Sequence, residues 1–421
     1  MTFGVGIDFG TTNSAVAVAE GGIGGTARLL PLPGPHGSIG NTWRTILFFE
    51  SGEQPNSVEV SAGGRAIERY EVSEGQGRLV QSIKSHLASE LFSGTQALGR
   101  RYRIEELIAT FLRQMRAAVS VDLGRKAVVG RPVRYWGARD AADEHRALGR
   151  MRAALALAGF DEVVFEYEPV AAAHAYAARL DHDELVLIAD FGGGTSDFSL
   201  MRVGPTTAPT VLATSGVAVA GDSFDARLID HVVAPALGRG SEYAAEFGRI
   251  MPVPPWLFTN LRRWHHLSFL RSRETSALLE KIQHGATAPA HIERLVRIVE
   301  DELGLPLHQA VEATKRALSG AMATEFHFER PGVTLASPVL RTELDTWIAE
   351  EVAALDAAVD EALLAAGVQA TQVNRVFTTG GSSLVPAVQR ILAQRFGADR
   401  LVGGEELTSV ASGLAISAAR L

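Results

Sequence analysis

Two segments of the sequence combine an aspartate with glycines and hydroxyl side chains in nearly the same order. The first covers residues 6–14 (GIDFGTTNS) and the second covers residues 188–197 (IADFGGGTSD). In each, an apolar stretch leads into Asp-Phe-Gly, small or hydroxyl residues follow, and a second apolar stretch begins. This order is typical of a tight β-hairpin, because glycine lets the turn approach a ligand with no side chain in the way. Successive backbone N–H groups in such a turn form an anion-binding nest, and threonine hydroxyls add donors.

The aspartates of the two segments, Asp8 and Asp190, come at the end of an apolar stretch. At that position a carboxylate could hold the water shell of a Mg²⁺ ion or an attacking water molecule. Two such turns facing each other would hold a polyphosphate between two lobes. A single copy could equally be a hairpin turn with a capping aspartate. The repetition favours phosphate binding and indicates an internal duplication.

Composition excludes several classes of protein. The 421 residues predict two to four subdomains, and 46% hydrophobic with 21% charged residues is ordinary for a globular chain. The net charge of −8 and the lack of a Lys/Arg block argue against a nucleic-acid or anionic-membrane surface. Without cysteine there is no disulfide, thiolate zinc site or cysteine nucleophile. No signal leader or long apolar run is present, so we expect a cytoplasmic protein.

Strands and helices alternate along the chain, which is the α/β pattern. In the first half we expect strands at 42–49, 127–130 and 163–166, a turn or helical segment at 78–84, and helices at 104–121, 139–158 and 170–180. In the second half, after the repeated hairpin, we expect a mainly helical stretch at 241–305, strands at 324–328 and 373–378, and helices at 223–234, 307–318, 341–366, 384–396 and 408–420.

Other familiar site motifs are missing. The sequence contains no G-x-x-x-x-G-K-[ST] loop, no G-x-G-x-x-G after a strand and no H-E-x-x-H. His265 and His266 have neither a carboxylate nor a third histidine at ligand spacing, so a surface or packing role is favoured over a metal site. The mixture of aromatic residues and arginines at 256–273 favours a helix core over a partner surface.

Five motifs together resemble the nucleotide-binding domain of the seventy-kilodalton heat-shock (DnaK-type) chaperones, and most of all the short YegD-like group. They occur in the family's order and span nearly the whole chain: GIDFGTTNS at 6–14, YEPVAAA at 167–173, DFGGGTSD at 190–197, EATKRALS at 312–319 and GGS at 380–382. The resemblance implies an α/β, actin-like ATPase fold, which is a duplicated ribonuclease-H-like fold with two lobes around a nucleotide cleft.

The resemblance also implies domain limits. Lobe I would cover residues 1–188 with residues 40–103 as its smaller subdomain. Lobe II would cover 189–404 with 226–338 as a smaller, partly divergent helical subdomain, and a helix in 405–421 would return to lobe I.

The catalytic residues implied by the resemblance are Asp8, Lys84, Glu168, Asp190 and Thr195. Asp8 and Asp190 would hold the waters of the metal and orient the attacking water. Glu168 would be a general base or water-orienting group. Lys84 would offset charge that builds up during phosphoryl transfer, although an exposed lysine without a catalytic role is the alternative reading of this residue alone.

The nucleotide-binding residues fall into four groups, and the implied cofactors are ATP or ADP with Mg²⁺, with K⁺ as a further candidate ion. The phosphates would be bound by Gly10, Thr11, Thr12, Asn13, Gly192, Gly193, Gly194 and Thr195, and by a turn containing Gly221. One helix face, with spacing i, i+3, i+4 and i+7, would bind ribose and adenine through Glu312, Lys315, Arg316 and Ser319. A further turn comprises Gly380, Gly381 and Ser382.

The sequence also departs from the family. Leu384 stands where the family has an arginine against the adenine, and Leu407 where an acidic residue is usual, so the base pocket should be more apolar. The linker and the β-sandwich peptide clamp of the family are not found. A client or co-chaperone would therefore bind lobe II, where the divergent stretch 241–305 carries aromatic residues that we expect to be exposed.

The function that these features favour is Mg²⁺-dependent ATP binding and slow ATP hydrolysis by a chaperone-like switch without a peptide-binding domain. One alternative is a sugar kinase of the same superfamily, which would need an aspartate base aimed at a substrate hydroxyl. Another is a non-enzymatic scaffold that uses the same fold with nucleotide.

Substituting Leu384→Arg tests the alignment at the base. We expect adenine nucleotides to bind more tightly by about 0.5–2 kcal/mol, because a guanidinium stacked on the base gains cation–π attraction. Isothermal calorimetry with ATP measures the change. Equal or weaker affinity would mean that residue 384 does not face the base.

Overall fold

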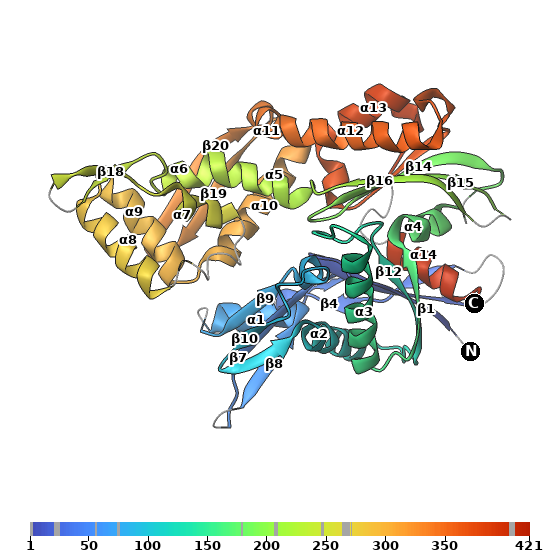
Figure 1. The fold of residues 1–421 in the computed structure, drawn as a ribbon, viewed down its shortest axis with the longest axis horizontal. Helices are drawn as coiled ribbons and strands as arrows, with labels where there is room; N and C mark the ends of the chain where they lie inside the picture. The colour runs from blue at the N-terminus through green and yellow to red at the C-terminus, as the bar shows by residue number, and fades with distance from the viewer. Residues whose placement is uncertain are drawn as a thin grey trace. The chain divides into compact units, whose positions relative to one another are not determined.

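The computed structural model describes residues 3–20, 26–54, 57–73, 76–177, 180–205, 209–245, 248–262, 270, 272–403 and 409–421 (Figure 1). The chain forms two compact units. Unit 1 comprises Met1–Ala220, Ala354–Leu384 and Val388–Leu421, and unit 2 comprises Gly221–Ala353 with Val385–Ala387. The expected lobe limits stay a prediction. His265, His266 and Leu407 lie outside the described residues.

Six strands form the first large sheet of unit 1: β1 (Phe3–Asp8), β2 (Asn13–Glu20), β3 (Ala27–Leu29), β6 (Trp43–Arg44), β12 (Lys126–Arg131) and β13 (Glu162–Tyr167). Their order is β13-β12-β1-β2-β3, with β6 paired to β2. β1, β2 and β3 form an antiparallel meander, and β12 and β13 are added parallel to β1.

Five strands form the second large sheet: β14 (Glu184–Phe191), β15 (Ser196–Val203), β16 (Thr210–Val217), β21 (Arg375–Thr379) and β22 (Leu401–Val402). Again three strands form an antiparallel meander, and two later strands are added parallel to the first of them. The order β22-β21-β14-β15-β16 repeats that of the first sheet, strand for strand. The internal duplication expected from the repeated Asp-Phe-Gly segment is therefore confirmed.

Four helices pack on the first sheet or on one another beside it: α2 (Ile104–Ala118), α3 (Ala141–Leu157), α4 (Glu168–Ala177) and α14 (Ser409–Ala418). These helices lie on the two opposite faces of the sheet. One face of β1 carries large side chains and the other carries glycines. Val5, Ile7 and Phe9 are buried in one core cluster, whereas Gly4 and Gly6 occupy the opposite face.

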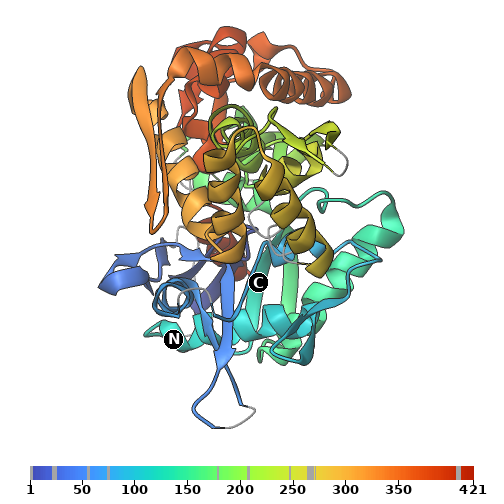
Figure 2. The same cartoon turned by 90° about the vertical axis from the view of Figure 1, so that its left-hand side faces the viewer.

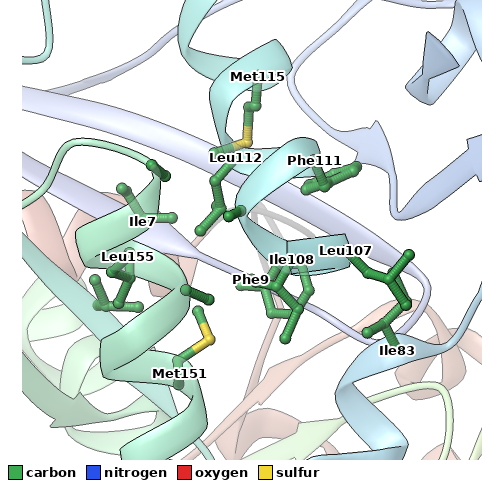
Figure 3. Close-up of a cluster of buried hydrophobic side chains, with 14 of the residues drawn as sticks. Ile7, Phe9, Ile83, Leu107, Ile108, Phe111, Leu112, Met115, Met151 and Leu155 are labelled. Carbon is green, nitrogen blue, oxygen red and sulfur yellow. The ribbon is translucent and has the colours of Figure 1, made fainter. Parts of the chain in front are cut away.

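The large-residue face of β1 packs against α2 and α3 (Figure 3). Buried residues of α2 recur at the predicted helical spacing, and Met151 and Leu155 of α3 join the same cluster. The α2 residues in this core are Ile104, Leu107, Ile108, Phe111, Leu112 and Met115. Ile83 also lies in this cluster, so the core reaches the segment that carries Lys84.

The glycine face of β1 is covered by α14 at backbone distance. A Cβ atom built on Gly6 would lie 2.3 Å from the backbone nitrogen of Ala415, which is too close for any side chain. On its other side α14 meets α4, where a Cβ on Gly413 would lie 1.6 Å from the carbonyl oxygen of Ala171. The same face of β2 contributes three alanines to this contact, namely Ala15, Ala17 and Ala19.

Smaller elements complete unit 1. They are β4 (Leu32–Pro33), β5 (Ile39–Gly40), β7 (Ile46–Ser51), β8 (Val58–Ala62), α1 (Gly63–Val72), β9 (Arg78–Gln81), β10 (Gly94–Ala97) and β11 (Arg100–Arg103), with 3₁₀ turns η1 (Pro35–Gly37), η2 (Ile83–His86), η7 (Ala370–Gln372), η8 (Gly381–Leu384) and η9 (Ala398–Arg400). β7 pairs with both β8 and β9. Helices α12 (Ala349–Ala366) and α13 (Pro386–Phe396) follow the order predicted from sequence.

Unit 2 consists of helices and two hairpins (Figure 2). Its elements are α5 (Gly221–Leu228), the π-helix η3 (Ile229–Val233), α6 (Ala234–Ala236), β17 (Glu242–Ala244), β18 (Ile250–Pro252), α7 (Pro255–Thr259), η5 (Asn260–Arg262), α8 (Arg273–Gly285), α9 (Pro289–Glu300), α10 (Gly304–Gly320), β19 (Ala323–Arg330), β20 (Val333–Leu340) and α11 (Arg341–Trp347). β19 and β20 pair along their full length. Among the helices that the structure describes, none has the length and apolar character needed to span a membrane.

Several expected elements differ from the structure. The strand at 42–49 is broken at Thr45, whose side chain bonds the hydroxyl of Ser14. The helix at 341–366 is interrupted at Ile348, where φ is −97° and ψ is 9°. The stretch 241–305 begins with the β17–β18 hairpin and is then mainly helical, which agrees with the expectation. Of the aromatics expected to be exposed there, Trp256 is 44% exposed but Phe258 is buried in the unit 2 core.

Substituting Gly413→Ala tests the close approach of α14. We expect a loss of stability of about 1–3 kcal/mol, because the new methyl group would overlap the backbone of α4 and force it apart. Gly149→Ala is the matched control, since this helical glycine of α3 has no neighbour within 4 Å of an added Cβ. The control should gain about 0.5–1 kcal/mol, because alanine loses less backbone entropy than glycine on folding. Thermal or urea unfolding midpoints measure both changes.

Candidate functional site

The first predicted turn connects β1 and β2 and is held by three short contacts. The Gly10 amide donates to the Ser14 hydroxyl at 3.3 Å, and this hydroxyl bonds Thr45 Oγ1 at 2.8 Å. The Thr45 amide donates to the carbonyl of Thr12 at 2.9 Å. A Cβ on Gly10 would lie 1.9 Å from the Asn13 carbonyl oxygen, so this position requires glycine. The residues of the turn between Gly10 and Ser14, including Thr11, are partly exposed and can present their N–H groups to a ligand.

The second predicted turn connects β14 and β15 in the same way. The Gly192 amide donates to the Thr195 carbonyl at 2.9 Å, and the Thr195 hydroxyl donates to Asp197 Oδ2 at 3.4 Å. Gly193, Gly194 and Thr195 are partly exposed. Both hairpins predicted from the repeated motif are therefore confirmed, and each leaves its turn partly exposed.

The turn at Gly380 lies against the second hairpin. β21 runs parallel to β14, with Thr379 in register with Asp190. Gly380 follows with a φ of +85°, and a Cβ there would lie 1.9 Å from the carbonyl oxygen of Phe191. Only glycine can adopt this conformation so close to the neighbouring backbone. Gly381 is exposed beside it and Ser382 is buried.

Lys84 and Glu168 form a short ion pair. Lys84 Nζ donates to Glu168 Oε1 at 2.6 Å, and only 11% and 10% of the two side chains are exposed. Glu168 is the first residue of α4, where the positive end of the helix dipole favours a carboxylate. Gly130, at the end of β12, has no side chain to displace Glu168, since a Cβ there would lie 3.1 Å from its Cγ.

Three aspartates surround this ion pair. Burial raises the pKa of Asp8 to about 7, with the charge of Glu168 adding to the effect and that of Lys84 opposing it. Burial, then the charges of Glu168 and Asp197, hold the pKa of Asp190 well above its ordinary value. Asp197 has its pKa raised to about 7, again chiefly by burial.

The pKa of Lys84 is shifted in the direction opposite to the one that burial alone would cause. Burial alone would lower the pKa of Lys84, but the charges of Glu168 and Asp8 outweigh this effect and raise the pKa above its ordinary value. The ammonium is therefore charged at every physiological pH. Its charge lowers the pKa of each of the three aspartates, against the effects of burial and of the neighbouring carboxylates.

This donor set fits a hydrated divalent cation. Carboxylate oxygens are the protein ligands that Mg²⁺ prefers, and an excess of buried negative charge favours a cation. Within the described residues, no three histidine or carboxylate side chains are arranged to bind a metal directly. A magnesium ion here would accordingly be held largely through its water shell.

Two members of the cluster were missed by the sequence analysis as site residues. Asp197 stands in the quoted motif but was not singled out, although its pairing opposite Asp190 in the hairpin follows directly from the turn length. Tyr135 is buried close enough to Lys84 and Glu168 for their charges to affect it, and burial raises its pKa to about 12. No local motif marks Tyr135.

The residues expected at the nucleoside lie in unit 2. On α10, Lys315 Nζ bonds Asp225 at 2.8 Å and the carbonyl of Gly221 at 3.2 Å. Glu312 and Arg316 form an i, i+4 ion pair at 3.5 Å, and the guanidinium side is largely exposed. The Ser319 hydroxyl donates to the Lys315 carbonyl at 3.3 Å.

In the ligand-free protein Lys315 is engaged by Asp225 and Gly221, and the assignment of this helix face to the nucleoside stays a prediction. A ligand that bound Lys315 would have to share it with this carboxylate. In unit 1, Leu384 ends η8 with 47% of its surface exposed, so its side chain is available for a ligand.

A family model described as Hsp70 protein matches residues 61–239 and 296–421, and this is well over half of the chain. The chain therefore belongs to the Hsp70 family. Proteins of this family have the actin-like ATPase fold, so the predicted fold class is confirmed. The resemblance to the YegD-like group stays a prediction.

Two ranges of the chain, residues 1–60 and 240–295, lie outside the match to the family model. Residues 1–60 contain the first turn, whose equivalence to the second is supported by the repeated strand order of the two sheets. Residues 240–295 contain the β17–β18 hairpin, α7 and α8.

The ligand-free protein should become more stable when one carboxylate of the cluster is neutralised. The folded pKa of Asp8 is raised to about 7, so its contribution to stability is present at low pH and is lost as pH rises through 7. Asp8→Asn removes this loss. We expect its melting temperature to exceed that of the wild type by an amount that grows from pH 5 to pH 8.

Asp143→Asn provides a control of opposite sign. Hydrogen bonds from Arg139 and then Arg146 hold the pKa of Asp143 well below its usual range, so the ionised form stabilises the fold above that range. This variant should melt below the wild type at pH 8. A lower melting temperature for Asp8→Asn at pH 8 would contradict the charge excess described above.

Proposed function

We propose that this Hsp70-family chain binds ATP with Mg²⁺ and hydrolyses it slowly, with Asp8, Lys84, Glu168 and Asp190 around the reacting phosphate and the two glycine-rich turns around the phosphate chain. The observation that carries the proposal is the Lys84–Glu168 ion pair at 2.6 Å, placed among aspartates that end β1 and β14. Binding sites for phosphate need backbone donors, and the sites for its transfer also need a fixed cation.

Lys84 supplies the fixed cation. Its ammonium has three donors, and one of them is used by Glu168. The remaining donors can bind phosphate oxygens, where they offset negative charge as the transferred group leaves. Because Glu168 holds the ammonium in the free protein, little reorganisation is needed when the substrate arrives.

The carboxylates serve the water and the metal. Magnesium, when bound, would neutralise phosphate charge and orient the phosphate oxygens. Asp8 and Asp190 would hold the waters of that ion, and Glu168 would orient the attacking water. Thr11, Thr12, Asn13 and Thr195 would add hydroxyl and amide donors for the phosphates.

The remaining assignments follow the family. Gly10, Gly192, Gly193 and Gly194 would let the turns approach the phosphates, and Gly221, Gly380, Gly381 and Ser382 would contribute further N–H groups. Glu312, Lys315, Arg316 and Ser319 of α10 would bind ribose and adenine. The release of Lys315 from Asp225 would then be coupled to nucleotide binding.

We further propose that nucleotide controls binding of a protein partner, a client or co-chaperone, through unit 2. The supporting observation is that residues 240–295 are not matched by the family model, whereas the residues on both sides of them are. A partner is affected by ATP only when it binds two nucleotide states with different affinity.

A thermal-shift panel tests the nucleotide proposal. Ligand that binds only the folded state stabilises it by RT ln(1 + [L]/Kd), so ATP or ADP with Mg²⁺ should raise the melting temperature at millimolar concentration. GTP and common sugars in the same panel separate base selectivity and the sugar-kinase alternative. No shift with any nucleotide would contradict the proposal.

Lys84→Ala tests the catalytic assignment. We expect hydrolysis to slow by about 10²-fold or more while ATP binding is largely kept, because the ammonium acts mainly on charge in the transition state. Single-turnover hydrolysis and calorimetry measure the two quantities. Lys126→Ala is the control, since this lysine is exposed and pairs with Glu162 on the surface. Unchanged single-turnover hydrolysis in Lys84→Ala would remove Lys84 from the site.

A further inference from the structure

The turn that carries Lys84 is short and begins in a strained conformation. It is the 3₁₀ turn Ile83–His86, and the residue before it, Ser82, has a φ of +53°. A non-glycine residue in this left-handed region costs free energy and persists only when surrounding contacts impose it. Residues 87–93, which follow the turn, contain neither a helix nor a strand. Regular secondary structure therefore does little to fix the position of Lys84.

Two arginines of α3 bind the backbone just after this turn. Nη1 of Arg150 donates to three carbonyl oxygens, those of His86 at 3.2 Å, Leu87 at 3.0 Å and Ser89 at 2.8 Å. Nη1 of Arg146 donates to the carbonyl oxygen of Ala88 at 2.9 Å. Four successive carbonyl groups, at residues 86–89, thus accept hydrogen bonds from two guanidinium groups.

The spacing of the arginines explains how two side chains serve one strip of backbone. Residues i and i+4 lie one above the other on a helix face, so Arg146 and Arg150 project side by side from α3. Arg152, two residues further on, points elsewhere and lies over the ring of Phe165 at 5.2 Å. Hydrogen bonds from a charged donor are the stronger kind. Of the four carbonyls, that of His86 also accepts a backbone hydrogen bond, from the Ser89 amide at 3.2 Å.

The two arginines are themselves fixed. Arg146 Nη1 also pairs with Asp143 at 2.5 Å, and the side chain of Asp143 is 3% exposed. Arg150 lies 3.8 Å from Glu105 of α2, and both of these side chains are mostly buried. Because α3 is packed into the core through Met151 and Leu155, the guanidinium positions are tied to the same core that holds β1.

We propose that Arg146 and Arg150 are positioning residues that clamp the backbone after Lys84 and so fix its ammonium against Glu168. The core holds the other side of this turn through Ile83 and Leu87, both fully buried. The arginines also fix the orientation of the peptide groups, because their hydrogen bonds go to backbone carbonyls, whereas the core contacts involve side chains. The consequence for hydrolysis rests on the proposed function, whereas the clamp itself concerns the ligand-free protein.

The test in the absence of nucleotide uses lysine side-chain nitrogen resonances. The chain contains only four lysines, at positions 84, 126, 281 and 315, so ¹⁵Nζ-labelled lysine gives a simple spectrum. An ammonium held in a short, shielded ion pair exchanges protons with water slowly and remains visible, unlike an exposed one. Lys84→Arg identifies its signal by removing it.

We expect Arg150→Ala to shift the Lys84 signal or to broaden it beyond detection, with Arg146→Gln giving a smaller change. Arg150→Lys should restore most of the signal, because an ammonium can still donate to these carbonyls. Arg152→Gln is the control on the same helix and should leave the signal unchanged. Circular dichroism and the melting temperature establish that each variant is folded; if Arg150→Ala is not, Arg146→Gln decides. An unchanged Lys84 signal in folded Arg150→Ala and folded Arg146→Gln would overturn the clamp.

The kinetic test separates positioning from a general loss of structure. In Arg150→Ala, kcat for ATP hydrolysis should fall at least tenfold with little change in KM, since a misplaced ammonium affects the transition state most. Combined with Lys84→Ala, the same substitution should have almost no further effect on kcat. An equal fall in both backgrounds would contradict the inference. If the wild-type protein shows no hydrolysis, the proposed function fails and the resonance experiment alone decides the clamp.

Discussion

The constraint on which the site depends is an imbalance of charge. Asp8, Glu168, Asp190 and Asp197 share the single ammonium of Lys84, and burial raises the pKa of all three aspartates. A fold gains no stability from such an arrangement by itself, because buried like charges repel. Under the proposed function, a cation and a phosphate group that bind together would offset this repulsion. In the free protein, the packing of the two sheets must offset the unfavourable free energy of these buried carboxylates. Asp8 and Asp190 lie where strands of those sheets end.

Much of the fold could be predicted because its signals are local. Glycines at turns, apolar strands on either side of them and the helical spacing of α2 all lie within short windows, and the two hairpins and the duplication followed from them. The predictions failed where distant residues decide local geometry. The strand at 42–49 is divided at Thr45, because β6 pairs with β2 whereas β7 pairs with β8 and β9. Similarly, Lys84 could be proposed from its resemblance, but nothing near it in the sequence indicates Glu168 or Tyr135 as neighbours.

The same distinction holds within the candidate site. Asp8 and Asp190 were identified because their motif repeats, and each lies where a strand of a repeated meander ends. The support for Lys84 is different in kind, since it comes from a turn without a repeated counterpart and from side chains of α3 that belong to another part of the sequence. From its sequence neighbours alone, an arginine in a helix is expected to lie on the surface. Only the fold reveals that two of them face the backbone beside the ammonium.

The glycine face of β1 has a consequence for how the protein folds. This face is completed by α14, so strands formed by the first twenty residues obtain their cover from residues 409–418. Contacts between such distant parts of a chain close large loops and slow folding. The chain loses conformational entropy when the loop closes, before the packing contacts can stabilise it. During synthesis the alanines of β2 and the backbone of β1 stay exposed until nearly four hundred further residues have been made. An incomplete chain of this protein is therefore expected to present an uncovered sheet and to associate with other chains.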